Sequence, residues 1–362
     1  MKRCLPLVAA ALLAVGCGVS DDGDAGVVYA AGRDAAEPAR RDFELDYRAT
    51  VPVPDGASTV DVWIPLPQDD ENQEVELAAL QAPGEVAFRE ESEFGARMLH
   101  VRLEAPRRPV EIGYRVRVAR REALRRPGAA DGAADGRTKH DPEIAKWLEP
   151  DARVPLDGRI RSLSAEVTAG AATDLEMARA IYDYVVETMS YSKEGTGWGN
   201  GDIYWACDAK RGNCTDFHAL FTGLARAAGI PAKFAIGFPI PVERGAGEIG
   251  GYHCWSEFWL DGHGWVPVDA SEARKDPGRH EYFFGSHDEN RVELTEGRDL
   301  VLAPTQQGDP LNYFVYPYAE ADGRPIEGVE RTFRYRDLDV RRSAAPRQRT
   351  PTSAARGATG KP

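Results

Sequence analysis

Cys214 is the residue of this sequence whose type and position best suit nucleophilic chemistry. It follows Asn213, a residue type that often caps helices, and apolar residues recur behind it at helical spacing until Gly229. The first turn of a helix has unpaired backbone N–H groups and the positive end of the helix dipole, and both stabilise a thiolate. The same N–H groups can bind an oxyanion. The sequence therefore predicts a helix that starts at Cys214 and carries a reactive thiol.

A thiolate nucleophile needs a base that later protonates the leaving group, and His253 is the candidate. It opens a predicted strand, and a turn of sequence DGHG joins that strand to a second one that ends at Asp269. A hairpin places its strands side by side, so Asp269 can orient the imidazole as in a Cys-His-Asp triad. His218, one turn after Cys214, is an alternative base, but it has no obvious carboxylate partner on its own helix.

Residue periodicity predicts the elements that must position these side chains. Residues 41–122 alternate apolar and polar positions and predict an all-β, sandwich-like domain. The alternating stretches are 43–51, 58–66, 97–105 and 110–120. Residues 123–141 are rich in Gly, Ala and Asp and are expected to form a linker.

Residues 142–341 have a different character, in which helices come before strands. A capping box formed by Thr173 and Glu176 predicts a helix ahead of the one at Cys214. Strands are predicted at 232–238, 252–260, 264–270 and 311–320. This order is typical of an α+β fold. The Pro-, Ser- and Arg-rich residues 342–362 are expected to be a disordered tail.

Three blocks within this second region, in this order, resemble the bacterial transglutaminase-like proteins. They read RGNCTDFHALFTGLARAAGIPAKFAIGF, GYHCWSEFWLDGHGWVPVDASEA and YFFGSHDENRVELTEGRD. The resemblance covers residues 175–320 and implies a papain-like core with an antiparallel sheet behind the N-terminal β domain. It also implies that Cys214 is the nucleophile, His253 the base and acid, and Asp269 the orienting partner. Cys254 stands where alanine often follows the histidine in this family, and Ala270 where proline often follows the aspartate.

The N-terminus predicts export. Lys2 and Arg3 precede a short apolar run, which has the layout of a signal peptide over residues 1–16. The Gly16–Cys17 junction resembles the lipobox of bacterial lipoproteins, so Cys17 is expected to carry lipid and to anchor the protein to a membrane of the cell envelope. Residues 17–40 are then expected to be a flexible tether.

Two further thiols, Cys207 and Cys254, accompany Cys214 in the predicted core. Side chains alternate along a strand, so Cys254 is expected to point away from the face that carries His253. A Cys207–Cys254 disulfide that leaves Cys214 free is the predicted pairing for an exported protein. A zinc site formed by these three cysteines and His218 is an alternative, but the sequence lacks the CxxC-type spacing of structural zinc sites.

The net charge of −13 argues against a basic surface for nucleic acid. The sequence instead predicts cysteine-dependent acyl transfer through a thioester, with a protein or peptide amide as the donor and an amine or water as the acceptor. This chemistry requires no cofactor and no metal. The alternative function is a non-catalytic surface lipoprotein that uses the same core as a binding or scaffold module.

Overall fold

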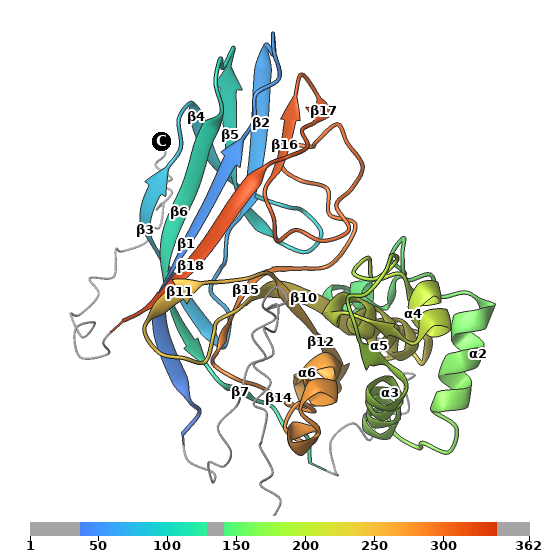
Figure 1. Cartoon of the computed structure of the whole chain (residues 1–362). Coiled ribbons are helices and arrows are strands. Elements are labelled where there is room, and N and C mark those ends of the chain that lie inside the picture. Colours follow the sequence, from blue (N-terminus) through green and yellow to red (C-terminus); the bar gives the residue numbers. More distant parts are fainter. Residues whose placement is uncertain (1–36, 129–140, 339–362) are drawn as a thin grey trace, which may run out of the picture.

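A computed structural model describes residues 37–128 and 141–338 of the 362-residue chain. It shows a β-sandwich beside a second part in which helices pack on an antiparallel sheet (Figure 1). The predicted α+β fold class, with a β-rich region before a helical and antiparallel-sheet core, is confirmed. The predicted signal peptide, Cys17 and the tail 342–362 lie outside the described residues, as does most of the predicted linker.

Two five-stranded antiparallel sheets form the sandwich. One has the strand order β11-β18-β1-β6-β3 and the other β17-β16-β2-β5-β4. The strands of the N-terminal region are β1 (Arg40–Val51), β2 (Thr59–Pro65), β3 (Gln73–Gln81), β4 (Glu85–Glu90), β5 (Arg97–Glu104) and β6 (Val110–Arg121). The four predicted strands correspond to β1, β2, β5 and β6. The sequence missed β3 and β4, because these edge strands are largely exposed and lack alternation.

The core of the sandwich consists of the inward-facing residues of both sheets. Along β1, Phe43, Leu45 and Tyr47 are completely buried, which is the period-two pattern of a strand with one face on the core. The rings of Tyr47 and Tyr114 stack with their centroids 5.1 Å apart. Their hydroxyls donate to the carbonyl oxygens of Val315 and Pro65, so both polar groups are satisfied inside the core.

The C-terminal strands belong to the sandwich, and this corrects the predicted boundaries. β18 (Glu330–Asp337) pairs with β1, β16 (Tyr318–Ala321) pairs with β2, and β17 (Arg324–Pro325) extends the second sheet. The assignment of all of residues 142–341 to the second domain was therefore wrong. The sequence did not predict β18 because most of its residues are exposed and charged. The predicted strand 311–320 was also wrong, since only its last residues enter β16.

The second part of the molecule consists of short helices around a four-stranded antiparallel sheet of order β13-β12-β10-β15. The strands are β10 (Ala232–Pro239), β12 (His253–Leu260), β13 (Gly264–Val268) and β15 (Arg291–Glu296). The helices are α1 (Pro142–Ala145), η1 (Lys146–Leu148), α2 (Gly158–Val167), α3 (Asp174–Thr188), α4 (Ile203–Ala209), α5 (Cys214–Ala227), α6 (Ala270–Lys275) and η2 (Pro277–Arg279). The shorter strands are β7 (Ala123–Leu124), β8 (Ser190–Tyr191), β9 (Arg211–Gly212), β11 (Ala246–Glu248) and β14 (Ser286–His287).

Helix α5 is the central helix of this part. Every residue from Cys214 to Arg226 is buried, because α2, α3 and α4 pack around the helix and β12 lies against it. A Cβ atom at Gly223 would lie 2.2 Å from Cδ1 of Ile203, so glycine is required where α4 crosses this helix. The start of α5 is thus held in the interior by packing on several sides.

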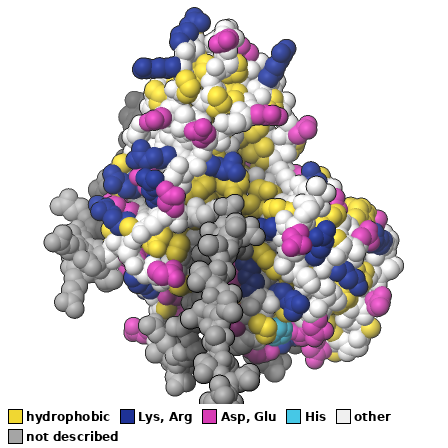
Figure 2. Space-filling view, viewed as in Figure 1, with side chains coloured by type: hydrophobic (Ala, Val, Ile, Leu, Met, Phe, Trp, Pro, Cys, Tyr) yellow, Lys and Arg dark blue, Asp and Glu magenta, His cyan; other side chains and the backbone are white. Residues whose placement is uncertain are grey.

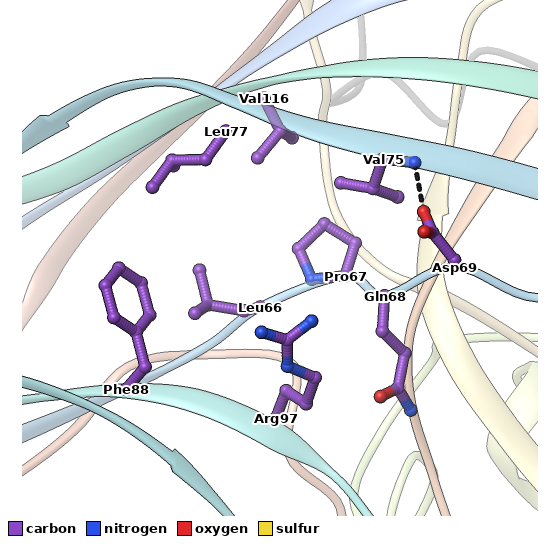
Figure 3. A pocket seen from close by; sticks show the side chains of 9 residues that line it. All are labelled: Leu66, Pro67, Gln68, Asp69, Val75, Leu77, Phe88, Arg97 and Val116. Carbon is purple, nitrogen blue, oxygen red and sulfur yellow. Dashed lines mark hydrogen bonds between the residues drawn. The ribbon is translucent and has the colours of Figure 1, made fainter. Parts of the chain in front are cut away.

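A cavity of about 280 Å³ opens between the edge strands β3 and β4 of the sandwich (Figure 3). Leu66, Leu77, Phe88 and Val116 give it an apolar wall, and Arg97 also lines it. Cys214, His253 and Asp269 are not among its lining residues, so the site described below lies elsewhere.

The visible face of the molecule carries charged side chains of both signs (Figure 2). Apolar side chains gather on this face where the sandwich meets the helical part. Among the helices of residues 37–128 and 141–338, none has the length and hydropathy needed to cross a bilayer.

Candidate active site

Cys214 is the first residue of α5, as its sequence context predicted. Asn213 caps the helix through its side-chain oxygen, which accepts from the backbone N–H of Thr215 at 3.0 Å. The side chain of Asp216 reaches back and accepts from the N–H of Asn213 at 3.0 Å, which completes a capping box. These contacts fix the turn on which the Cys214 thiol sits, and Cys214 is only 2% exposed.

Asp216 also holds the glycine-rich loop that passes over the start of α5. Its carboxylate accepts from the backbone N–H of Gly199 at 2.7 Å and of Gly201 at 3.1 Å. Burial raises the pKa of Asp216 to about 6, although the three backbone donors oppose that rise. A Cβ atom at Gly212 would lie 2.3 Å from Oδ2 of Asp216, so the close approach of the chain requires glycine there. Sequence analysis missed the role of Asp216, because its partners Gly199 and Gly201 lie in a loop 17 and 15 positions away.

His253 and Asp269 meet as the hairpin prediction required. β12 and β13 pair in antiparallel register, and Nε2 of His253 lies 2.7 Å from Oδ2 of Asp269. The other oxygen of Asp269 accepts from the Ser271 hydroxyl and from the Glu272 N–H, both at 3.1 Å, so the carboxylate also caps α6. Cys214 is among the causes that raise the pKa of His253, and since Asp269 occupies Nε2, Nδ1 is the ring nitrogen left to serve the thiol.

Arg291 is a further partner of Asp269 that the sequence did not reveal. Its Nη1 lies 3.2 Å from Oδ2 of Asp269, and its Nη2 lies 3.4 Å from Oδ2 of Asp288. The side chains of all three residues are almost completely inaccessible to solvent. The guanidinium thus helps to keep the buried Asp269 ionised and in place.

The charges of the site favour a thiolate–imidazolium pair. Burial alone would raise the pKa of Cys214, but hydrogen bonds from Cys254 and His253, together with the positive charge of His253, hold it well below its usual range. Burial would lower the pKa of His253, but Asp269 and Cys214 outweigh it and raise the pKa to about 10. Burial would likewise raise the pKa of Asp269, yet His253 and Arg291 hold it well below its usual range.

His218 lies closer to this network than the sequence indicated. Its Nε2 is 3.6 Å from Oδ1 of Asp269, so the carboxylate that sequence analysis did not find on the helix of His218 comes from the end of the β12–β13 hairpin. His253 makes the shorter contact with Asp269 and also bonds to Cys214. Burial lowers the pKa of His218 to about 4, and the residue is therefore neutral at physiological pH.

Cys207 and Cys254 are both free thiols, and the predicted disulfide between them is wrong. Cys207 is half-buried on α4 and packs against the hydrophobic core of the helical part. Cys254 lies instead against the first turns of α5, with its sulfur 3.6 Å from Nδ1 of His218 and 4.0 Å from Oγ1 of Thr215. Both residues pair with β10 in regular register, and the expectation that Cys254 points away from the site was wrong because α5 packs on the side to which Cys254 points. Within residues 37–128 and 141–338, no three His, Cys, Asp or Glu side chains are arranged to hold a metal ion.

A group of tyrosines lies beside the start of α5. The hydroxyl of Tyr252 accepts from Nδ2 of Asn213 at 2.8 Å and lies 2.9 Å from Oγ1 of Thr215. The rings of Tyr313 and Tyr316 pack on Tyr252 with centroids 5.5 and 5.8 Å away. Tyr252 thus ties the strand that carries His253 to the cap of the helix that carries Cys214.

Alkylation of Cys214 by iodoacetamide is expected to remain fast well below the pH at which an ordinary thiol reacts. For a thiol with a pKa of about 8.5, the fraction present as thiolate falls roughly 150-fold between pH 8.5 and pH 6. The pKa of Cys214 is lowered and that of His253 is raised to about 10, so the pair is charged across this range. The labelling rate at pH 6 should therefore stay within about tenfold of the rate at pH 8.5.

Peptide-resolved mass spectrometry of the labelled protein measures this rate and supplies an internal control. Burial raises the pKa of Cys207, so its labelling should decline steeply as the pH is lowered. Parallel pH profiles for Cys207 and Cys214 would contradict the thiolate–imidazolium pair.

Known proteins resemble this chain in sequence and in fold. Residues 161–270 match the family model of the transglutaminase-like superfamily. An uncharacterized protein of Haemophilus influenzae is 26% identical over 330 residues, which cover 81% of this chain and 89% of that protein. The uncharacterized protein YebA of Bacillus subtilis is 24% identical over 138 residues, or 34% of this chain and 19% of its own length.

A solved structure shares the fold over most of the chain. The crystal structure of a putative cysteine protease from Cytophaga hutchinsonii superposes with a TM-score of 0.55 at 17% identity, and the match covers 83% of this chain and 92% of that one. The segment matched by the family model contains Cys214, His253 and Asp269, which the fold brings into one buried network. Residues 161–270, which contain this network, are therefore similar to the core of the transglutaminase-like superfamily.

Proposed function

We propose that the protein is a cysteine-dependent acyltransferase or hydrolase that acts on protein or peptide amides through a thioester at Cys214. The observation that carries this proposal is the buried Cys214–His253–Asp269 arrangement at the start of α5. The description of the Cytophaga hutchinsonii neighbour as a putative cysteine protease is consistent with an amide donor.

In the proposed reaction, the Cys214 thiolate attacks the amide carbonyl and forms a tetrahedral intermediate. The backbone N–H of Cys214 stabilises the oxyanion, because the N–H groups of the first helical turn have no carbonyl partner within the helix. The His253 imidazolium donates its proton to the departing amine, which leaves a thioester and a neutral imidazole. Asp269 keeps the ring in the tautomer and orientation that this transfer requires.

The second half of the reaction transfers the acyl group to an amine or to water. Neutral His253 takes a proton from the acceptor as it attacks the thioester, and Cys214 leaves as the thiolate. A primary amine as acceptor gives a new amide, whereas water gives a carboxylic acid.

One experiment tests the activity and identifies the acceptor. The purified protein is incubated with glutamine-containing peptides and a fluorescent primary amine, while ammonia release and amine incorporation are followed in parallel. Ammonia release with incorporation supports acyl transfer, and release without incorporation supports hydrolysis of the glutamine amide. Cleavage of the peptide backbone, detected by mass spectrometry of the same mixture, supports peptidase activity. A protein that shows none of these and forms no acyl adduct at Cys214 with an electrophilic glutamine or peptide analogue would contradict the proposal.

We also propose that the protein acts in the cell envelope and is held there by lipid on Cys17. The support comes from the sequence alone, from the charged start, the apolar run and the Gly16–Cys17 junction. The serine variant Cys17→Ser is expected to move the protein from the membrane to the soluble fraction, because a lipid anchor requires the thiol. Fractionation followed by immunoblotting measures the shift. A serine variant that remains fully membrane-bound would contradict the lipid anchor.

A further inference from the structure

A second thiol lies against the candidate nucleophile. Cys254 is completely buried, and its sulfur is 3.6 Å from Nδ1 of His218 and 4.0 Å from Oγ1 of Thr215. Both neighbours lie on the first turns of α5, whose first residue is Cys214. Each of the two thiols also shifts the pKa of the other, so they interact across this turn. The packing of β12 on α5 therefore places the Cys254 sulfur against the helical turn that begins with Cys214, and both residues belong to the same buried cluster.

The two sulfurs differ in ionisation, as thiol oxidation requires. Cys214 is the thiolate of the pair, and the thiolate is the form that attacks peroxides and disulfides. Burial and the neighbouring Cys214 charge raise the pKa of Cys254, so it remains a protonated thiol beside the thiolate. A low-pKa cysteine with a resolving cysteine in contact is typical of redox-sensitive thiols.

We propose that Cys214 and Cys254 form a reversible disulfide, with hydrogen peroxide as the oxidant, and that this bond is a modification site of the protein. The disulfide follows from the position of the Cys254 sulfur against the first turns of α5, which begins at Cys214. Its consequence, that acyl transfer stops while the bond exists, rests on the proposed function of Cys214.

The oxidation proceeds in two balanced steps. The Cys214 thiolate attacks one oxygen of hydrogen peroxide, the O–O bond breaks, and the leaving hydroxide takes a proton from the His253 imidazolium to form water, which gives a sulfenic acid at Cys214 and a neutral imidazole. The sulfur of Cys254 then attacks the Cys214 sulfur, the S–O bond breaks, and the departing hydroxide takes up the Cys254 proton as a second water. Two thiols lose two electrons in total, and one peroxide is reduced to two waters.

The surroundings of Cys254 favour the second step. Formation of the sulfenic acid removes the negative charge of Cys214, which is one of the causes that raise the pKa of Cys254. The carboxylate of Asp269 faces Nε2 of His218 and favours the tautomer with its proton there, so Nδ1 can accept a hydrogen bond from the Cys254 thiol before the proton passes to the departing hydroxide. The neutral state of His218 is consistent with this role.

Cys207 does not compete for the sulfenic acid and provides a matched control. It lies on α4 and packs with a different group of residues from the one that contains Cys214 and Cys254. Substitution of Cys207 by alanine is therefore expected to leave the Cys214–Cys254 bond unaffected.

The test treats the reduced full-length protein with hydrogen peroxide, blocks free thiols with iodoacetamide and maps peptides without reduction. The expected product is a pair of linked peptides that contain Cys214 and Cys254 and are lighter by two hydrogens than the free peptides. Dithiothreitol should then restore alkylation of Cys214. In the Cys254→Ala variant the sulfenic acid should accumulate, react with dimedone and proceed to sulfinic acid, so recovery by dithiothreitol should fall by about tenfold or more. The Cys207→Ala variant should behave like the unchanged protein.

The proposal is overturned if the unchanged protein gives Cys214 sulfinic acid while Cys254 stays free, or if Cys254→Ala recovers as fully as the unchanged protein. It is also overturned if peroxide leaves both thiols unchanged. Such results would not contradict the proposed function, because formation of an acyl adduct at Cys214 tests that function separately. Conversely, a disulfide that forms in a protein without acyl transfer would support the modification site and contradict the proposed function alone.

Discussion

The alanine variant Cys214→Ala is expected to form no thioester and to lose all acyl transfer, because the remaining side chains of the network supply no nucleophile in its place. Cys254 lies next to the vacated position, but burial is the largest cause of its raised pKa and persists in the variant, so it remains a thiol. The helix should persist, since its cap comes from Asn213 and Asp216 rather than from the thiol. Alanine is also the best helix former at a first-turn position.

Intact-mass spectrometry with an electrophilic glutamine or peptide analogue measures this effect. The unchanged protein should gain one adduct, and the alanine variant none, while circular dichroism should show the same helical content for both. An adduct of equal yield in the alanine variant would place the nucleophile on another residue.

The two histidines of the site allow a matched comparison. His253→Ala removes the ring that contacts both Cys214 and Asp269, so acylation should fall to traces. His218→Ala removes a neutral ring 3.6 Å from Asp269 and should cost much less. Single-turnover acylation rates of the two variants show which histidine acts as the base. Equal losses in both variants would mean that His253 is not the sole base.

The sequence predicted those parts of the site that short-range signals determine. Asn213 and Gly229 bracket the Cys214 helix, and the DGHG turn fixes the hairpin that brings Asp269 to His253. Each of these signals acts within one helix or one hairpin. Local residue types therefore suffice to place Cys214, His253 and Asp269 in the fold.

The parts that the sequence missed depend on contacts between distant segments. His218 faces Asp269 only because α5 packs on the β12–β13 hairpin, and Arg291 reaches Asp269 from β15. Cys254 approaches α5 because the helix packs on β12, and the sequence of β12 alone does not reveal which side the helix covers. The charged strand β18 completes the sandwich by pairing along β1, and its only apolar alternation consists of Phe333 and Tyr335, which is too short to predict a strand.

The asparagine variant Asp269→Asn is expected to lower turnover by about 10⁴-fold, the loss that the corresponding change causes in a Ser-His-Asp protease. One oxygen of Asp269 accepts from the Ser271 hydroxyl and the Glu272 N–H, so the carbonyl of an asparagine must stay on that side. Its NH₂ group then faces Nε2 of His253, where the carboxylate oxygen lies at 2.7 Å. Nε2 must become an acceptor, and the ring proton moves to the nitrogen that serves Cys214. His253 in this tautomer cannot accept a proton from the attacking amine or water.

The same change should also alter the ionisation of Cys214, which gives a readout independent of turnover. Without the carboxylate, the main cause that raises the pKa of His253 is lost, and the imidazolium that stabilises the thiolate disappears near neutral pH. The alkylation profile of Cys214 should therefore move toward that of an ordinary thiol, with slow labelling at pH 6. Ser271→Ala removes only one hydrogen bond to the opposite oxygen and is the matched control, with a much smaller loss of turnover expected. An asparagine variant that kept both its turnover and its fast labelling at pH 6 would show that Asp269 does not set the proton position on His253.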